Sequence, residues 1–106
     1  MIDTVTALSG SGPAYVFLLA EAMQSAGVKL GLSEAIAKKL AERTILGAGI
    51  LLTQEASISS ELRENVTSKG GTTSAALSVL MEGDCLVNLI LKAMQKAEER
   101  SRELGQ

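Results

Sequence analysis

The segment from Ala14 to Ala26 constrains the fold of this 106-residue chain most strongly, because only Glu21, Gln24 and Ser25 in it are plainly polar. A helix that is apolar around most of its circumference is usually buried on several sides. Hydrophobic residues make up 46% of the sequence, yet so small a domain buries only a limited fraction of its own surface. The sequence therefore indicates that part of this apolar surface is buried against a partner.

Capping residues divide the first half of the chain into two predicted helices. Pro13 suits the first turn of the helix that contains the apolar segment, and Gly27 suits the left-handed position that would end it. Ser33 is a good cap for a second helix, which runs through the apolar stretch ILGAGILL and should be most deeply buried there. Gly47 and Gly49 each weaken a helix by about 1 kcal/mol relative to alanine, so we expect close approach of another helix to compensate.

The second half of the chain predicts three more helices. A short helix over residues 61–66 follows a cluster of serines. Thr72 can cap a helix over about residues 73–82, which Gly83 would end, and the last helix covers about residues 84–104. No run of residues alternates between apolar and polar as a strand does. We therefore predict a single all-α domain, residues 1–106, with about five helices and no sheet.

The charge balance disfavours nucleic acid and membrane as partners. Ten lysines and arginines are scattered among twelve aspartates and glutamates, so no basic patch offers itself to either. The longest apolar stretch is far shorter than the roughly 20 residues that a bilayer crossing needs. The first residues do not resemble a signal peptide, and we expect a soluble protein.

The sequence has no histidine and one cysteine, Cys85. This composition excludes a disulfide framework, a zinc site and a Cys–His nucleophile pair within one chain, and no metal is expected. Cys85 stands beside Leu86 and Val87, so we expect a buried free thiol, which fits a reduced, cytoplasmic compartment.

The stretch VTSKGGTTSAAL, residues 66–77, is the best candidate for a binding site. If Thr72 caps a helix, the N–H groups of Gly71, Thr72 and Thr73 point into one concavity that attracts a carboxylate or phosphate. Ser68 and the two threonines add neutral hydroxyl donors, and Lys69 could add charge. The residues alone leave a second interpretation open, in which this is only a capping loop.

Two other features of the sequence are weaker candidates for a functional site. The stretch SGSGP, residues 9–13, is not followed by a strand–helix crossover, so a tight turn with a helix cap is favoured over a nucleotide loop. Glu21 is a single carboxylate in an apolar helix, where contact with solvent or a partner is favoured over acid–base chemistry.

Several separated motifs resemble one known family, in the same order. They are TVTALSGSGPAY (4–15), GVKLGL (27–32), LRENV (62–66), TS and GGTT (67–68 and 70–73) and EERSREL (98–104). Together they are similar to the carboxy-terminal domain of the pyrroline-5-carboxylate reductases over nearly the whole chain. The resemblance implies reduction of L-1-pyrroline-5-carboxylate to L-proline with NADPH or NADH, in proline biosynthesis. It also implies an interlocked helical homodimer, whose active site is completed by a dinucleotide-binding Rossmann domain.

The resemblance also assigns roles to individual residues. It places Thr73 as the catalytic hydroxyl at the ring nitrogen of the substrate, and the backbone of Gly71, Thr72 and Thr73 at the substrate carboxylate. Ser68 lines the same pocket, and Asn65 lies near the cofactor.

The chain departs from the family pattern in ways that limit these expectations. Lys69 stands where the family usually has proline, Ser74 replaces a branched apolar residue, and Met81 replaces an acidic or amide residue. No glycine-rich dinucleotide fingerprint is present, so the Rossmann domain is missing and the isolated domain is expected to be inactive. The alternative is a helical dimerisation module without chemistry, whose GGTT loop is only a helix cap.

Overall fold

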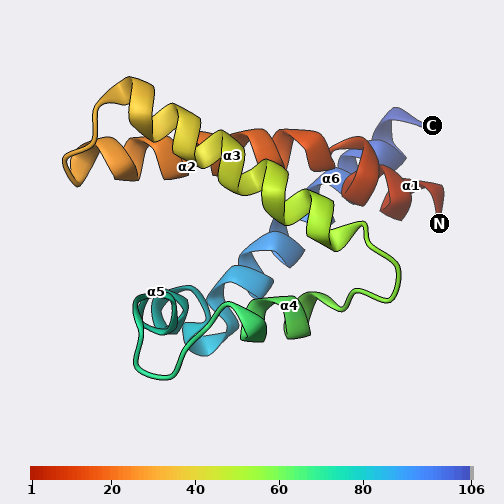
Figure 1. Cartoon of the computed structure of the whole chain (residues 1–106). Helices are drawn as coiled ribbons and strands as arrows, with labels where there is room; N and C mark the ends of the chain where they lie inside the picture. Colours follow the sequence, from red (N-terminus) through yellow and green to blue (C-terminus); the bar gives the residue numbers. More distant parts are fainter. Residues whose placement is uncertain (106) are drawn as a thin grey trace. The chain divides into compact units, whose positions relative to one another are not determined.

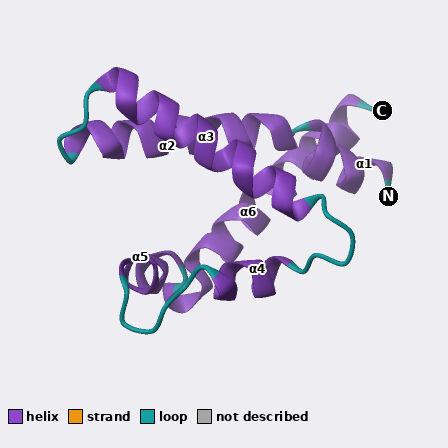
Figure 2. Ribbon diagram, in the orientation of Figure 1, coloured by secondary structure: helices purple, strands orange, loops and turns teal. Residues whose placement is uncertain are grey.

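The computed structural model describes residues 1–105, which form helices and turns and contain no strand, as predicted (Figure 2). In chain order the elements are α1 (Ile2–Val5), a π-helix (Thr6–Gly10), α2 (Gly12–Lys29), α3 (Glu34–Leu52), α4 (Ser59–Asn65), α5 (Thr72–Leu80), a 3₁₀ turn (Glu82–Asp84) and α6 (Cys85–Leu104) (Figure 1). They form two compact units. The terminal unit combines Met1–Tyr15 with the chain from Thr67 onward, and the central unit is Val16–Val66. The single domain stays a prediction.

Residues 2–10 of the terminal unit are helical, which the sequence did not indicate. In the π-helix the N–H of Ser11 donates to the carbonyl of Thr6 at 2.9 Å, five residues back. Ala7 is 1% exposed, and its carbonyl accepts a hydrogen bond of 2.6 Å from the hydroxyl of Tyr15. The π-helix and α1 both contact α6. Since α1 and the π-helix together form one helical segment of only nine residues, its helical form depends on this tertiary packing.

The central unit contains an antiparallel pair of helices, most of α2 and all of α3, joined by a tight turn. Ser33 caps α3 as predicted, because its hydroxyl accepts a hydrogen bond from the N–H of Ile36. Gly27 does not end α2, contrary to the prediction. The helix continues to Lys29, and Gly31, with φ of 113°, is the residue with positive φ.

The end of α2 is a Schellman motif. The N–H of Leu32 donates to the carbonyl of Gly27, and the N–H of Gly31 donates to the carbonyl of Val28, both at 3.0 Å. Gly27 instead serves helix packing, since a Cβ there would lie 3.3 Å from both the Cβ of Ala37 and the side chain of Leu32. Within this chain, the close approach between helices is therefore found at Gly27 and not at Gly47 or Gly49, where the sequence suggested it. A Cβ at Gly47 or Gly49 would meet no atom within 4 Å in the described residues.

Little apolar surface is buried within the chain itself. Among the described residues only three hydrophobic side chains are buried, those of Ala7, Ala37 and Ala41. Phe17 in α2 is 67% exposed and Leu46 in α3 is 55% exposed, so the predicted burial of α2 on several sides and of the far half of α3 is not found within one chain.

Cys85 is also exposed, which contradicts the predicted buried thiol. Its Sγ contacts the carbonyl of Leu80 at 3.0 Å, at the start of α6. The apolar neighbours Leu86 and Val87 that suggested burial are themselves uncovered, so apolar neighbours in sequence did not imply burial.

The last helices otherwise match their predicted extents closely. α6 covers Cys85–Leu104, one residue from the expected start, and Gly83 adopts the positive φ expected of a helix-ending glycine. α5 ends earlier than predicted, at Leu80, because residues 82–84 form a separate 3₁₀ turn.

Ala56, in the loop between α3 and α4, has φ of 63°, where a Cβ is strained. We predict that Ala56→Gly raises the free energy of unfolding by about 0.5–1 kcal/mol, measured by denaturant unfolding. The matched control is Ala48→Gly within α3, which should lower it by about 1 kcal/mol. A destabilising effect of Ala56→Gly would contradict the strain.

Candidate functional site

The loop that leads into α5 is a tight turn in the terminal unit. The N–H of Gly71 donates to the carbonyl of Ser68 at 3.0 Å, which closes a four-residue turn. Gly70 has φ of 73°, whereas Lys69 does not have a positive φ, and this combination defines a type II turn. Lys69 occupies the second position of that turn, where proline is favoured. The proline that the resemblance leads us to expect at this position would suit the same turn.

Helix α5 begins at Thr72, and its cap residue is Gly71, with φ of −86° and ψ of −176°. The prediction that Thr72 caps this helix is therefore wrong by one residue. The first intrahelical bond runs from the N–H of Ala75 to the carbonyl of Gly71 at 3.1 Å, and no side chain caps the helix. The N–H groups of Thr72, Thr73 and Ser74, in the first turn of the helix, therefore have no intrahelical acceptor.

The set of backbone donors is consequently shifted along the chain. The N–H of Gly71 was expected to point into the concavity, but it is already hydrogen-bonded to Ser68. Ser74 supplies a further donor that the sequence did not indicate, because α5 begins one residue earlier than predicted. Gly71 as a substrate-binding residue stays a prediction, and so do Thr72 and Thr73.

Ser68 and Gly71 fit together sterically. A Cβ at Gly71 would overlap the hydroxyl oxygen of Ser68 and lie 3.3 Å from its carbonyl oxygen. Only glycine therefore allows Ser68 to keep this position. Ser68 and Thr72 are exposed and Thr73 is half-buried, and the hydroxyls of these three residues make no hydrogen bond within residues 1–105.

Asn65, the predicted cofactor residue, is the last residue of α4 and belongs to the central unit. It is exposed. Its role near a cofactor stays a prediction.

The arrangement around α5 suits recognition of a small anion that also carries a hydrogen-bonding group. Backbone N–H groups at a helix start favour a carboxylate or phosphate. Three free hydroxyls beside them can donate to or accept from a neutral or protonated nitrogen. Lys69 makes no ion pair among the described residues, so its charge is not neutralised locally. The loop offers recognition and positioning rather than a redox group.

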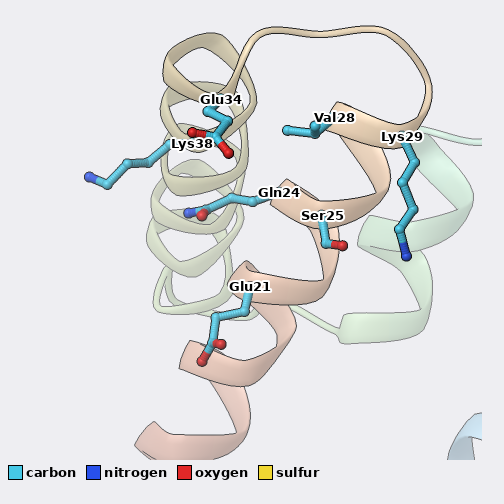
Figure 3. Close-up of a pocket in the computed structure, with 7 residues that line it drawn as sticks. All are labelled: Glu21, Gln24, Ser25, Val28, Lys29, Glu34 and Lys38. Carbon is cyan, nitrogen blue, oxygen red and sulfur yellow. The ribbon is translucent and has the colours of Figure 1, made fainter.

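Glu21 lies elsewhere, in a groove of about 500 Å³ between α2 and α3 of the central unit (Figure 3). Gln24 extends toward α3 in this groove. Two carboxylates and two ammonium groups line it: Glu21, Glu34, Lys29 and Lys38. This mixed, solvated lining agrees with the interpretation of Glu21 as a surface residue.

Within the described residues, no group of three or more histidine, cysteine, aspartate or glutamate side chains is placed to hold a metal ion. No single helix in this part of the chain is long and apolar enough to cross a membrane. One bent pair, Thr72–Leu80 with Glu82–Leu104, passes the same criteria of length and composition together, with 41° between its helices.

An all-α chain with largely uncovered apolar helix faces is typical of helical association domains. Residues 1–104 match the protein family described as pyrroline-5-carboxylate reductase dimerisation, and the chain belongs to this family.

Relatives of known sequence agree with this assignment. The chain is 48% identical to a pyrroline-5-carboxylate reductase of Haemophilus influenzae, over 97% of this chain and 38% of the relative. It is 44% identical to one of Arabidopsis thaliana, over 100% of this chain and 38% of the relative. The chain thus spans less than half the length of these relatives.

Solved structures show the same fold. The pyrroline carboxylate reductase of Plasmodium falciparum, solved with NADP bound, matches with a TM-score of 0.91 and 36% identity, over 99% of this chain and 40% of that one. A pyrroline-5-carboxylate reductase from Coxiella burnetii matches with a TM-score of 0.91 and 46% identity, over 97% of this chain and 38% of that one.

The overlap at Gly71 gives a test of the loop geometry. We predict that Gly71→Ala lowers the free energy of unfolding by about 0.5–1.5 kcal/mol, because the new Cβ forces the hydroxyl of Ser68 out of its present rotamer. When Ser68 is also replaced by alanine, Gly71→Ala should lower the free energy of unfolding by less. A double-mutant cycle should give a coupling energy of about 0.5 kcal/mol or more between the two substitutions.

The matched control is Gly12→Ala at the start of α2, where a Cβ meets nothing within 4 Å in the described chain. This control should not destabilise the protein. Additive effects of the changes at residues 68 and 71 would contradict the overlap.

Proposed function

We propose that this chain is the dimerisation and substrate-binding part of a pyrroline-5-carboxylate reductase, which reduces L-1-pyrroline-5-carboxylate to L-proline with NADPH or NADH in the cytoplasm. The observation that carries the proposal is the tight turn that leads into α5, with uncapped N–H groups and free hydroxyls side by side. The names of the relatives and the NADP-bound structure of the Plasmodium falciparum protein support it.

The ligand chemistry of the loop fits the substrate, a five-membered imine that carries a carboxylate. The uncapped N–H groups of Thr72, Thr73 and Ser74 bind the carboxylate at the helix start. Gly71 brings the backbone close to the ligand, because no Cβ stands in the way. Ser68 lines the pocket with its hydroxyl. These contacts hold the ring in one orientation, which is how a binding site accelerates a transfer reaction between two bound molecules.

Thr73 acts at the reacting end of the substrate. Its hydroxyl hydrogen-bonds the ring nitrogen and keeps the C=N bond aligned, since a hydroxyl can both donate and accept. When bound, the nicotinamide cofactor would supply a hydride to the carbon of this bond, and the ring nitrogen would carry the proton that balances the reduction. Asn65 contributes to the cofactor side of the site, and a dinucleotide-binding part joined ahead of α1 contributes the remainder. The 106-residue chain is therefore inactive by itself.

We predict that Thr73→Val lowers kcat/KM about 10- to 100-fold, because the hydrogen bond to the ring nitrogen is lost. The measurement uses a hybrid reductase in which this chain replaces the matching region of the Haemophilus influenzae relative. Thr73→Ser should keep most of the activity, because it keeps the hydroxyl.

Ser78→Ala is the control for this series, since the hydroxyl of Ser78 bonds only the carbonyl of Ala75 within α5, at 2.6 Å. An unchanged kcat/KM in Thr73→Val would contradict the catalytic role of Thr73. It would favour a dimerisation module whose loop is only a helix cap.

Self-association is the second part of the proposal: two copies of the chain form an interlocked homodimer. It is supported by the family's description as a dimerisation domain and by the exposed apolar faces of α2, α3 and α6. Gly47 and Gly49 fit the same proposal, because within the described chain no atom comes near enough to explain two glycines inside a helix.

We predict that the chain sediments as a dimer at micromolar concentration and that Gly47→Leu raises the dimer dissociation constant at least about tenfold, because a bulky side chain blocks close helix approach. Ala35→Leu, at the start of the same helix, is the matched control and should leave the dissociation constant unchanged. A monomeric chain, or equal effects of the two leucines, would overturn this part of the proposal.

A further inference from the structure

Two hydroxyl–carboxylate hydrogen bonds join α1 to the last turns of α6 in opposite directions. The hydroxyl of Thr4 donates to Oε2 of Glu98 at 2.5 Å, and the hydroxyl of Ser101 donates to Oδ1 of Asp3 at 2.7 Å. Each helix thus gives one hydroxyl and accepts with one carboxylate. We call these four residues the hydroxyl–carboxylate clamp.

The clamp connects parts of the chain that are far apart in sequence. Its partners are separated by 94 and 98 positions, and both ends of the described chain lie side by side in Figure 1. Glu98 is also held from within α6, where one of its oxygens lies 3.7 Å from Arg102. Hydrogen bonds to ionised groups are stronger than neutral ones. The bond of Ser101 to Asp3 is partly buried and the bond of Thr4 to Glu98 is exposed, so water competes more with the second.

The packing next to the clamp supports a fixed position for α1. Ala7 is buried where the π-helix meets α6, and the hydroxyl of Tyr15 holds the carbonyl of Ala7. A small cavity of about 90 Å³ lies between the two segments, and it is lined by residues of both: Thr4, Ala7, Leu91, Met94, Gln95 and Glu98. α1 continues directly into the π-helix, and the nine residues together are too few to form a stable helix by themselves. The direction of this helical segment therefore depends on its packing against α6.

We propose that Thr4 and Ser101, with their acceptors Glu98 and Asp3, are positioning residues that fix the direction in which the dinucleotide-binding part joins the helical domain. This inference rests on the proposed function, in which that part precedes α1. α6 follows α5 through a single 3₁₀ turn and belongs to the same unit as the substrate loop. The clamp thereby holds α1, which leads to the cofactor-binding part, against α6. Both helices belong to the unit that also carries Thr73.

The positioning role has a kinetic signature that differs from substrate binding. A misdirected connection leaves the substrate loop intact but places the cofactor less accurately, so kcat falls while KM stays nearly constant. In the hybrid reductase we expect Thr4→Val combined with Ser101→Ala to lower kcat about 3- to 30-fold and to change KM by less than about twofold. Thr4→Ser should restore most of the loss when introduced in place of Thr4→Val.

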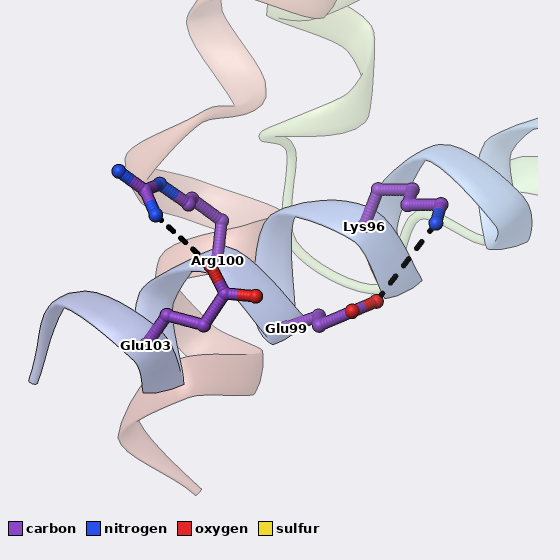
Figure 4. Close-up of polar contacts among 4 residues, drawn as sticks. All are labelled: Lys96, Glu99, Arg100 and Glu103. Atoms are coloured by element: carbon purple, nitrogen blue, oxygen red, sulfur yellow. Dashed lines mark hydrogen bonds and ion pairs between the residues drawn. The ribbon is translucent and has the colours of Figure 1, made fainter. Parts of the chain in front are cut away.

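Two control variants lie close to the clamp without belonging to it. Ser9→Ala removes a hydroxyl that bonds the carbonyl of Val5 within the same helical segment, at 3.0 Å. Arg100→Gln removes the 2.9 Å ion pair with Glu103, which runs along α6 like the pair of Lys96 with Glu99 (Figure 4). Neither control should change kcat.

Amide hydrogen exchange on the 106-residue chain tests the clamp independently of activity. Residues 2–10 should be protected, and the double variant should lose this protection while α5 keeps its own. Unchanged protection would show that the clamp does not hold α1, and lost protection with unchanged kcat would show that it only stabilises the fold. Either result overturns the inference. An inactive hybrid with the clamp intact would instead count against the proposed function.

Discussion

Burial of apolar surface is the constraint on which this structure depends, because the chain has far more of it than its own fold can cover. Helices in water are stabilised mainly by packing an apolar face against something else. Within the described residues that packing reaches only three alanines, while Phe17, Leu46 and Leu89 keep more than half of their surface exposed. In the proposed homodimer, the apolar helix faces of a second copy would cover the apolar surface that one copy leaves exposed.

The candidate site depends on a different and more local effect, the backbone geometry of one turn. Gly70 supplies a positive φ and Gly71 leaves room for the hydroxyl of Ser68. Because the turn uses the N–H of Gly71 itself, the free donors begin at Thr72. The two glycines therefore have separate roles: Gly70 allows the backbone conformation of the turn, and Gly71 avoids a steric clash. Both roles shape the loop without any contact to a ligand. This local arrangement lies within one unit and does not rely on how the two units are placed.

Most helices were predictable because their signals are local. Ser33 caps α3 through a bond to a residue three positions on, and Gly83 ends a helix by its own φ. Errors arose where the signal depends on a distant neighbour. Gly27 resembles a helix end in sequence, but it is needed for contact with Ala37, and Gly31 ends the helix instead. Residues 2–10 carry no strong helix signal and are held in place by α6.

The sequence by itself determined the all-α class, the approximate extents of the helices, the family and the loop that carries the candidate site, because these follow from short-range patterns and from motifs in a fixed order. Only the tertiary structure decided which glycines allow close helix packing and which allow a turn, and that Cys85 is exposed. It also decided that Ser74 rather than Gly71 has a free N–H, and that α1 is hydrogen-bonded to α6. The physical reason is the same in each case. Whether a group is buried, hydrogen-bonded or free depends on which other group reaches it in space, and sequence separation does not reveal that.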